Sequence, residues 1–381
     1  MNKQTVNKAN TKTEIFEFDN GTEARECQAV IHVTNTSLSY AEQLDALLNT
    51  YDELRSNELR GTEAVFKRYY LSDAANQATT IHAMAAEGSD CALSVIEQAP
   101  LDGTKVALWV YMQSGVATAI SPSGLYRVAH GRYTHLWDGG AHRHEANSEL
   151  QTRLLLNSYV MQLAAEGCSL ADNCIRTWFF VNDVDINYAG MVKARNEVFA
   201  TQSLTPATHF IASTGIGGRQ EDATVSVQMD NYAIKGICKE QIQHLYAADH
   251  MNRTSDYGVS FERGTSVEYG DRHHVFISGT ASIDTNGDVV YPGDIRKQTE
   301  RMWGNVEALL REAGCTFDDV AQMTVYLRDP ADYSTVKAMF DGRFPSTPRL
   351  IVHAPVCRPG WLIEMECMAI CTASHKEFAP F

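Results

Sequence analysis

The stretch LQTRLLLNSYVMQLAAEGCSLADNCIRTWFFVND (150–183) has a second copy in KQTERMWGNVEALLREAGCTFDDVAQMTVYLRD (297–329). The pair Gln151-Thr152 aligns with the Gln-Thr of the second copy, and Gly167-Cys168 aligns with its Gly-Cys, without a gap between them. Each copy shows an amphipathic helix pattern that stops at glycine, then a short turn containing Asp, then an apolar strand. A long repeat of this kind predicts that the chain is built from copies of one unit.

The resemblance between the copies continues beyond these stretches. A second helix follows in both, YAGMVKARNEVF and YSTVKAMFDGRF, and two strands follow the helix. A fainter third copy lies at the front, with AEQLDALLNTYDELRSNEL as its helix and KVALWVYMQ as its last strand. This order of elements predicts an α+β unit, a mixed sheet with two helices on one face. We expect a polar tail at 1–12, units of this kind at 13–113, 114–236 and 262–374, and a connector at 237–261.

A sheet that carries helices on one face leaves its other face bare. In all three copies the bare face is apolar, so exposing it to water is unfavourable. Three copies in one chain can bury these faces against one another. The sequence therefore predicts an internal pseudo-trimer within a single chain, with any further association left open.

Composition narrows the functional class. The chain has 381 residues, of which 44% are hydrophobic and 21% charged, and a net charge of -15 that argues against binding nucleic acid. No apolar run reaches the roughly 18 residues of a membrane span, and the polar start shows no signal peptide. Nine cysteines without regular spacing predict reduced thiols in a cytoplasmic protein.

The third unit resembles the Rid (YjgF, endoribonuclease L-PSP) family. The matching segments, in the family's order, are FISGTASID, NGDVVYPGD, NVEALLREAGCTFDDV, VYLRD, TPR and LIEMECMAI. The resemblance implies ligand clefts between subunits of a trimer. It also implies that Arg349 grips a substrate carboxylate and that Glu364 is the acidic residue of the site. Lys337 departs from the family, which often has Asn there.

Units two and three together also resemble the chorismatases, enzymes that hydrolyse chorismate and carry Rid-like domains in one chain. The matching segments are RTWFF, GMVKARNEVF, PATHFIASTGIG, VSFERGT and VCRPGWLIEME, within about 160–370. The chain departs from the chorismatase pattern at Trp178-Phe179-Phe180, where that family has Trp-Asn-Tyr. The tyrosine-rich segment of the chorismatases is not recognisable in 228–258.

The residues themselves point to the same place in unit three. Glu364 and Glu366 share one face of a strand by alternation, and Arg349 heads the strand before it. Unit two has Gln228 and Asp230 at the two acidic positions, and Ala207 is its expected match to the arginine, so one working site per chain is expected. A buried carboxyl has a raised pKa and can deliver a proton near neutral pH, and arginine offers a planar fork for a carboxylate.

Further substrate-binding candidates come from the two resemblances and from position beside a strand end. For each, a structural role as a core residue or an ion-pair partner is the alternative. Cys357 is not expected to be a nucleophile, because no His/Asp pattern accompanies it. The candidates are Phe261, Arg263, Ser278, Gly279, Thr280, Ala281, Cys357, Arg358, Glu366, Arg176 and Arg195.

Three functions fit these residues. The first is hydrolysis of a small carboxylated imine or enamine, a Rid-type 2-iminoacid deaminase with Arg349 as anchor and Glu364 as general acid/base. The second is chorismatase-like hydrolysis of chorismate or a related enol ether with release of pyruvate, and the third is a non-catalytic regulatory protein that binds a small molecule. None requires a cofactor or metal, and the three histidines of GRYTHLWDGGAHRHE (131–145) match no structural metal site and predict a polar hairpin loop.

Overall fold

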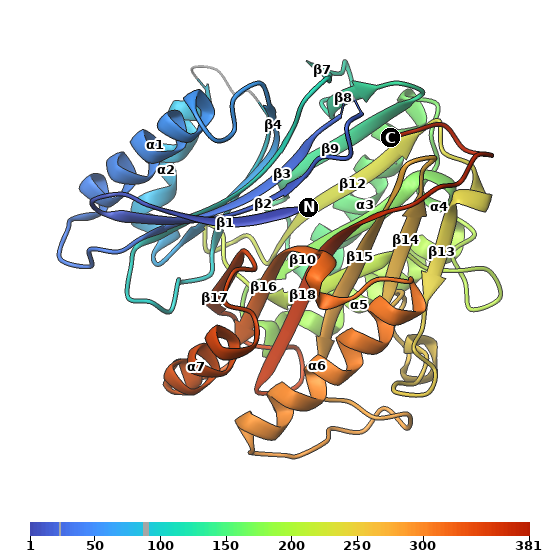
Figure 1. Cartoon of the computed structure of the whole chain (residues 1–381). Coiled ribbons are helices and arrows are strands. Elements are labelled where there is room, and N and C mark those ends of the chain that lie inside the picture. Colours follow the sequence, from blue (N-terminus) through green and yellow to red (C-terminus); the bar gives the residue numbers. More distant parts are fainter. Residues whose placement is uncertain (23, 87–90) are drawn as a thin grey trace.

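The computed structural model describes residues 1–22, 24–86 and 91–381, and it contains three six-stranded sheets with helices around them (Figure 1). The first sheet has the strand order β1-β2-β3-β6-β4-β5. Its elements are β1 (Asn2–Asn7), β2 (Thr11–Phe18), β3 (Glu26–Val33), α1 (Tyr40–Ser56), β4 (Glu63–Leu71), α2 (Ala74–Ala86), β5 (Ala92–Glu97) and β6 (Val106–Gln113).

The second sheet has the order β11-β10-β12-β9-β8-β7, which repeats the arrangement of the first when it is followed from β7 to β11. Its elements are β7 (Ala117–Ile120), β8 (Tyr126–His130), β9 (Tyr133–His142), α3 (Ser148–Ala165), α4 (Leu170–Asn173), β10 (Cys174–Val181), α5 (Val184–Thr201), β11 (Ala212–Gly217) and β12 (Val227–Lys235).

The third sheet has the order β13-β14-β15-β18-β16-β17. Its elements are β13 (Ile242–Leu245), β14 (Gly264–Glu268), β15 (Arg272–Ala281), α6 (Ile295–Glu312), β16 (Val320–Leu327), α7 (Tyr333–Arg343), β17 (Arg349–His353) and β18 (Ile363–Thr372). Short 3-10 turns occur at Lys239–Gln241, Thr254–Tyr257, Phe317–Asp319 and Pro330–Asp332.

Local sequence explains where the quoted helix begins and ends. Asp294 caps α6 by accepting a hydrogen bond from the backbone N–H of Lys297, which satisfies one of the unpaired amides of the first turn. Gly314 follows the helix with φ +73°, a left-handed conformation that glycine adopts without a steric penalty. The buried face of α6 includes Met302, Val306 and Leu309, at helical spacing.

The strand pairing confirms the predicted fold class. In each sheet one parallel pair, β4–β5, β10–β11 or β16–β17, lies beside an antiparallel pairing with the last strand of the unit. Figure 1 shows α1 and α2 on the outer side of the first sheet and α6 and α7 on the outer side of the third. The chain thus consists of three Rid-like α+β units, and no helix within the described residues has the length and apolar character to span a membrane.

Aromatic and charged side chains from different units meet where the bare sheet faces converge. The ring of Phe66 lies 5.1 Å from that of Trp137 and 6.4 Å from that of Trp178. Within this apolar centre, Arg68 of the first unit donates to Asp230 of the second from Nε at 3.1 Å and from Nη2 at 2.7 Å. Both side chains are fully buried, so the ion pair joins two units without contact with solvent.

Several local predictions differ from the structure. The expected polar tail contains β1, which pairs along its length with β2, and the expected connector contributes β13 to the third sheet. Most of the expected polar hairpin loop is strand β9. The prediction that all cysteines are reduced is wrong, because Cys315 and Cys371 form a disulfide. The two cysteines are 56 residues apart, so their spacing in the sequence did not indicate a bond. They come together because α6 packs against β15 and β18.

Replacing Arg68 with Met tests the buried ion pair between units one and two. The variant leaves the Asp230 carboxylate buried without its cation, and loss of one partner from such a pair costs about 3–5 kcal/mol in the free energy of unfolding. Urea denaturation of the whole chain measures this change.

Arg153→Met is the matched control, because its ion pairs with Glu149 and Glu197 lie at the surface, where solvent screens them and their contribution to stability is small. Equal stability losses in the two variants would contradict the assignment of the central pair.

Candidate functional site between units two and three

Glu364 is the second residue of β18 and lies at the boundary between the second and third units. It pairs with Ala281 of β15 on one side and Tyr326 of β16 on the other, which places it in the middle of the sheet. Only 5% of the residue is exposed. A carboxyl side chain is therefore held within a sheet that is otherwise apolar at its neighbouring positions.

The Glu364 cleft is a cavity that encloses about 600 Å³ of empty space, part of it open to solvent. Elements of two units and of the segment between them build its wall. The lining residues are Tyr188, Arg195, Ser213, Gly215, Val259, Phe261, Arg263, Gly279, Ala281, Ile283, Cys357, Arg358, Trp361 and Glu364.

The protonation state of Glu364 follows from its surroundings. Burial raises the pKa of this carboxyl to about 8, and the negative charge of Glu366 contributes to the increase, against the lowering effect of Arg263 and Arg176. At neutral pH the side chain is therefore mostly a neutral carboxylic acid. A neutral acid in a cleft can donate a proton to a bound molecule.

Three arginines from separate segments line the same cavity. Arg195 comes from α5 of unit two, Arg263 directly precedes β14, and Arg358 lies in the turn before β18. The guanidinium groups of Arg195 and Arg263 lie 5.9 Å and 5.5 Å from the ring of Phe261, which also lines the cleft. The cleft thus combines positive charge with a neutral acid, a combination suited to a small anionic ligand.

The Glu364 carboxyl lies against a stretch of backbone that has no side chain, because the residue there is Gly279. The β15–β18 pairing shifts between Ile277 and Thr280, and Gly279 lies in this irregularity. Its N–H donates to the Thr214 hydroxyl at 2.8 Å, which ties units two and three together. A Cβ at Gly279 would overlap Oε1 of Glu364, so the carboxyl occupies the space that a side chain would fill.

The structure does not bring Arg349 and Glu364 together, and the prediction that they share one cleft is wrong. Arg349 lies in a different cavity, between units one and three. There its guanidinium group bonds the Asp341 carboxylate and donates to the carbonyl oxygens of Phe344 and Thr347. Its side chain is thus held by its own unit rather than aimed at the Glu364 cleft.

Strand register explains the separation. Arg349 pairs with Met323 of β16, and the corresponding pair in unit two is Ser213 with Thr177 of β10. The residue of unit two that occupies the arginine position is therefore Ser213, not Ala207 as the sequence alignment predicted. Ser213 lines the cleft of Glu364. Within one unit, the position of Arg349 and the position of Glu364 face different neighbouring units. One cavity is therefore lined by the Glu364 position of one unit and the Arg349 position of the next.

Glu366 and Arg176 lie outside the Glu364 cleft. Arg176 donates to Glu366 from Nη2 at 2.7 Å, and the indole N–H of Trp178 donates to the same carboxylate at 2.8 Å. Arg68 approaches it to 4.0 Å. Glu366 and Arg176, both predicted to bind substrate, are thus part of the buried charge network at the centre of the pseudo-trimer. This is the ion-pair role that the sequence analysis gave as the alternative.

The other candidates divide between the cavity wall and the layer behind it. Gly279, Ala281 and Cys357 line the cavity. Ser278 instead donates to the carbonyl of Glu262 at 2.6 Å, and Thr280 donates to the carbonyl of Ser278 at 2.9 Å. Burial raises the pKa of Cys357 to about 12, which keeps it a neutral thiol at neutral pH.

Several lining residues were missed from sequence. Tyr188 lies on α5 seven residues before Arg195, a spacing that places both on one face of a helix, so a periodicity signal was present. Trp361 and Val259 come from irregular segments and carried no such signal.

Comparisons with known proteins agree with this architecture. Residues 266–371 match the family model described as endoribonuclease L-PSP. A RutC family protein of Pyrococcus abyssi is 35% identical over 97 residues, which cover 25% of this chain and 76% of that protein. The 3-aminoacrylate deaminase RutC of Acinetobacter baylyi is 33% identical over 97 residues, covering 25% of this chain and 77% of its own.

A crystal structure of a chorismatase resembles the chain over a much longer region. The match has a TM-score of 0.64 at 18% sequence identity and covers 81% of this chain and 93% of the chorismatase. The fold and the cleft define a protein of fused Rid-like units with a cavity between two of them. Through its C-terminal unit the chain belongs to the Rid family, whose model carries the endoribonuclease L-PSP description.

The Gly279→Ala variant tests how closely the Glu364 carboxyl is positioned. The added methyl group displaces the carboxyl, and a misplacement of about 1 Å costs on the order of 100-fold in turnover. The measurement is the turnover rate under saturating substrate, with circular dichroism to check folding.

Gly304→Ala serves as the control, since a Cβ at this helical position meets nothing within 4 Å. If both alanine variants retain full turnover, the acid does not need the position that the structure gives it.

Proposed function

We propose that the protein is a cofactor-free hydrolase that uses neutral Glu364 as a general acid on a small carboxylate-bearing enol ether, in a chorismatase-like reaction. The observation that carries the proposal is the cleft itself, where one carboxyl with a raised pKa lines the same cavity as three arginines. A chorismate-type substrate carries two carboxylates. A cleft with several cationic groups suits such a substrate better than a substrate with a single carboxylate.

The reaction assigned to this cleft begins with transfer of the Glu364 proton to the terminal methylene carbon of the enol ether. The resulting cation is attacked by water at the carbon that bears oxygen, and the Glu364 carboxylate recovers a proton from that water. Collapse of the hemiketal breaks the carbon–oxygen bond and yields pyruvate and the free alcohol. Arg195, Arg263 and Arg358 hold the carboxylates during these steps.

A Rid-type reaction is the second candidate, and the deaminase named among the relatives favours it. An enamine is protonated at carbon by the same neutral acid, and water then converts the imine to a 2-keto acid and ammonia. This candidate gives the anchoring role to the arginines of the Glu364 cleft, because Arg349 lies elsewhere. Binding of a small anion without turnover is the remaining outcome.

The deciding experiment incubates the purified chain with chorismate and, separately, with 2-iminoacids generated in situ. We expect pyruvate from chorismate, and Glu364→Gln should lower the rate by about 100- to 10,000-fold because it removes a general acid. Glu300→Gln, an exposed carboxylate on α6, is the matched control and should keep the wild-type rate.

Release of keto acid from imines alone supports the Rid-type reaction instead. If neither substrate is turned over faster by wild type than by Glu364→Gln, the enzyme proposal fails for both and a binding role takes its place.

The arginine assignment is tested by comparing Arg263→Ala with Arg349→Ala. Loss of a charged contact to a carboxylate costs roughly 1.5–3 kcal/mol, so Arg263→Ala should raise KM more than tenfold. Arg349→Ala should leave kcat/KM near the wild-type value, because this arginine lies in another cavity. The reverse ranking would return the anchoring role to Arg349.

The pH dependence follows from the raised pKa of Glu364. The acid is present below its pKa of about 8 and disappears as the pH rises through that value. On the alkaline side, kcat/KM should therefore fall about tenfold per pH unit, as expected when one essential proton is lost. A rate that increases through the same range would show that Glu364 acts as a base.

A further inference from the structure

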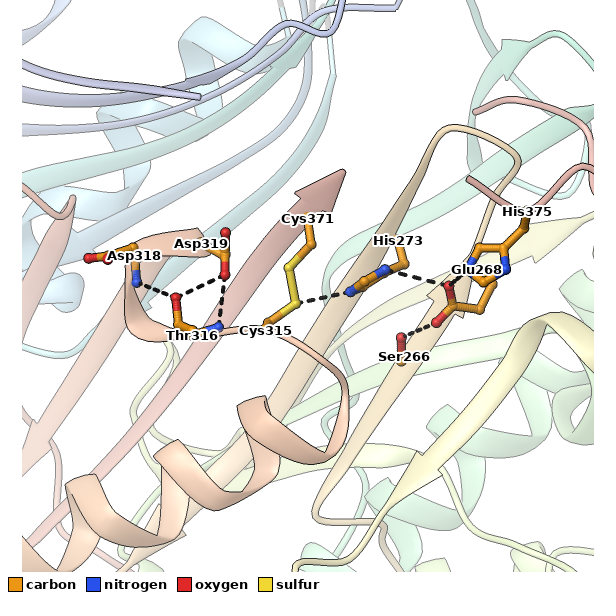
Figure 2. Close-up of a disulfide and its surroundings, with 9 residues drawn as sticks. All are labelled: Ser266, Glu268, His273, Cys315, Thr316, Asp318, Asp319, Cys371 and His375. Atoms are coloured by element: carbon orange, nitrogen blue, oxygen red, sulfur yellow. Dashed lines mark hydrogen bonds and ion pairs between the residues drawn. A yellow bond between two sulfur atoms is a disulfide. The ribbon is translucent and has the colours of Figure 1, made fainter. Parts of the chain in front are cut away.

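A second cluster of reactive side chains lies in the third unit, at the opposite end of β15 from Gly279. Figure 2 shows the Cys315–Cys371 disulfide with the His273 ring beside it and Glu268 and His375 beyond the ring. His273 and Gly279 are six residues apart on one strand, which corresponds to roughly 20 Å. The proposed hydrolase does not use these groups.

The sheet itself assembles the cluster. The antiparallel pairing of β15 with β18 sets His273 directly opposite Cys371, and the pairing of β14 with β15 sets Glu268 opposite His273. Cys315 arrives from the end of α6, directly after Gly314. Three strands and one helix end therefore hold these groups in place whether or not the two sulfurs are bonded.

The orientation of the His273 ring is that of a metal ligand. Its Nε2 lies 3.0 Å from Sγ of Cys315, and its Nδ1 lies 3.5 Å from Oε2 of Glu268. A metal-binding histidine typically offers one nitrogen to the ion and directs the other to a carboxylate, which fixes the ring. The Ser266 hydroxyl donates to the same carboxylate at 2.8 Å, and Nε2 of His375 lies 2.9 Å from it, so Glu268 is itself held in position.

The ligand atoms are close enough for a single ion. Those of His273, Cys315 and Cys371 all lie within 4.8 Å of one another, and the three residues are buried. The Cα atoms of the two cysteines are 6.5 Å apart, which leaves room for the sulfurs to separate when the bond between them is cleaved. Two thiolates and one imidazole are a ligand set that zinc accepts, with a fourth position left for water.

We propose that reduction of the Cys315–Cys371 disulfide creates a binding site for one zinc ion or a similar thiophilic divalent cation. Cys315 Sγ, Cys371 Sγ and His273 Nε2 are its protein ligands, and Glu268 orients the histidine. The protein then exists in two forms, an oxidised form closed by the disulfide and a reduced form closed by the metal. Either closure ties the end of α6 to the end of β18.

A dithiol is the reductant that converts the oxidised form to the reduced form. The dithiol gives up two electrons and two protons and becomes a disulfide, while the Cys315–Cys371 bond is cleaved to two thiols. Zinc binding then displaces both thiol protons to solvent, because the thiolate is the metal ligand.

The test uses the full-length chain in its oxidised and reduced forms. A phosphine reduces one sample, the reagent is removed without air, and both samples are dialysed against Zn²⁺ and analysed by elemental mass spectrometry. We expect one additional zinc ion per chain in the reduced sample. Peptide mapping after alkylation should show that zinc protects Cys315 and Cys371 specifically.

Variants identify the ligands. Cys371→Ser and His273→Gln should abolish the additional zinc, and Glu268→Gln should weaken binding by about 10- to 100-fold because it removes the carboxylate that orients the histidine. Cys238→Ser, which removes an exposed thiol, is the matched control and should bind zinc as wild type does.

Because a variant that fails to fold is uninformative, the wild-type comparison decides on its own. Equal zinc content in the oxidised and reduced chains overturns the proposal. Zinc that leaves Cys315 and Cys371 open to alkylation overturns it as well.

Discussion

The structure depends on one constraint, the need of three apolar sheet faces to be buried. Helices cover the outer face of each sheet, so the inner faces find cover only in one another (Figure 1). Aromatic side chains such as Phe66, Trp137 and Trp178 fill the centre, and the Arg68–Asp230 and Arg176–Glu366 pairs join different units within it. Because a buried charge without its partner is costly, each pair ties its two units together.

Fusion of the units makes their three interfaces different. Units two and three enclose the Glu364 cleft, and units one and three enclose the cavity that holds Arg349. Between units one and two the backbones approach closely, since a Cβ at Gly139 would lie 2.6 Å from the carbonyl oxygen of Leu93. The three interfaces carry different side chains, and the neutral acid and three arginines line the cavity between units two and three.

Much of this was predictable from residues that repeat or alternate. Helix and strand periodicity in the quoted repeat predicted the unit, and family resemblance predicted Glu364, Phe261 and Arg263 in one cleft. The position of Arg349 was not predictable, because alternation shows the face of a strand but not which neighbouring unit that face meets. The Cys315–Cys371 disulfide was missed for a similar reason, since tertiary pairing alone joins residues 56 positions apart.

The central claim is that Glu364 is a neutral acid at physiological pH. Infrared difference spectra between wild type and Glu364→Gln, recorded across a pH series, measure this directly through the carbonyl stretch of the protonated carboxyl. The account predicts a protonated band at neutral pH that disappears with a midpoint near the pKa of about 8. A carboxylate band already present in full at pH values of about 5 to 6, the range just above an unperturbed glutamate, would contradict it.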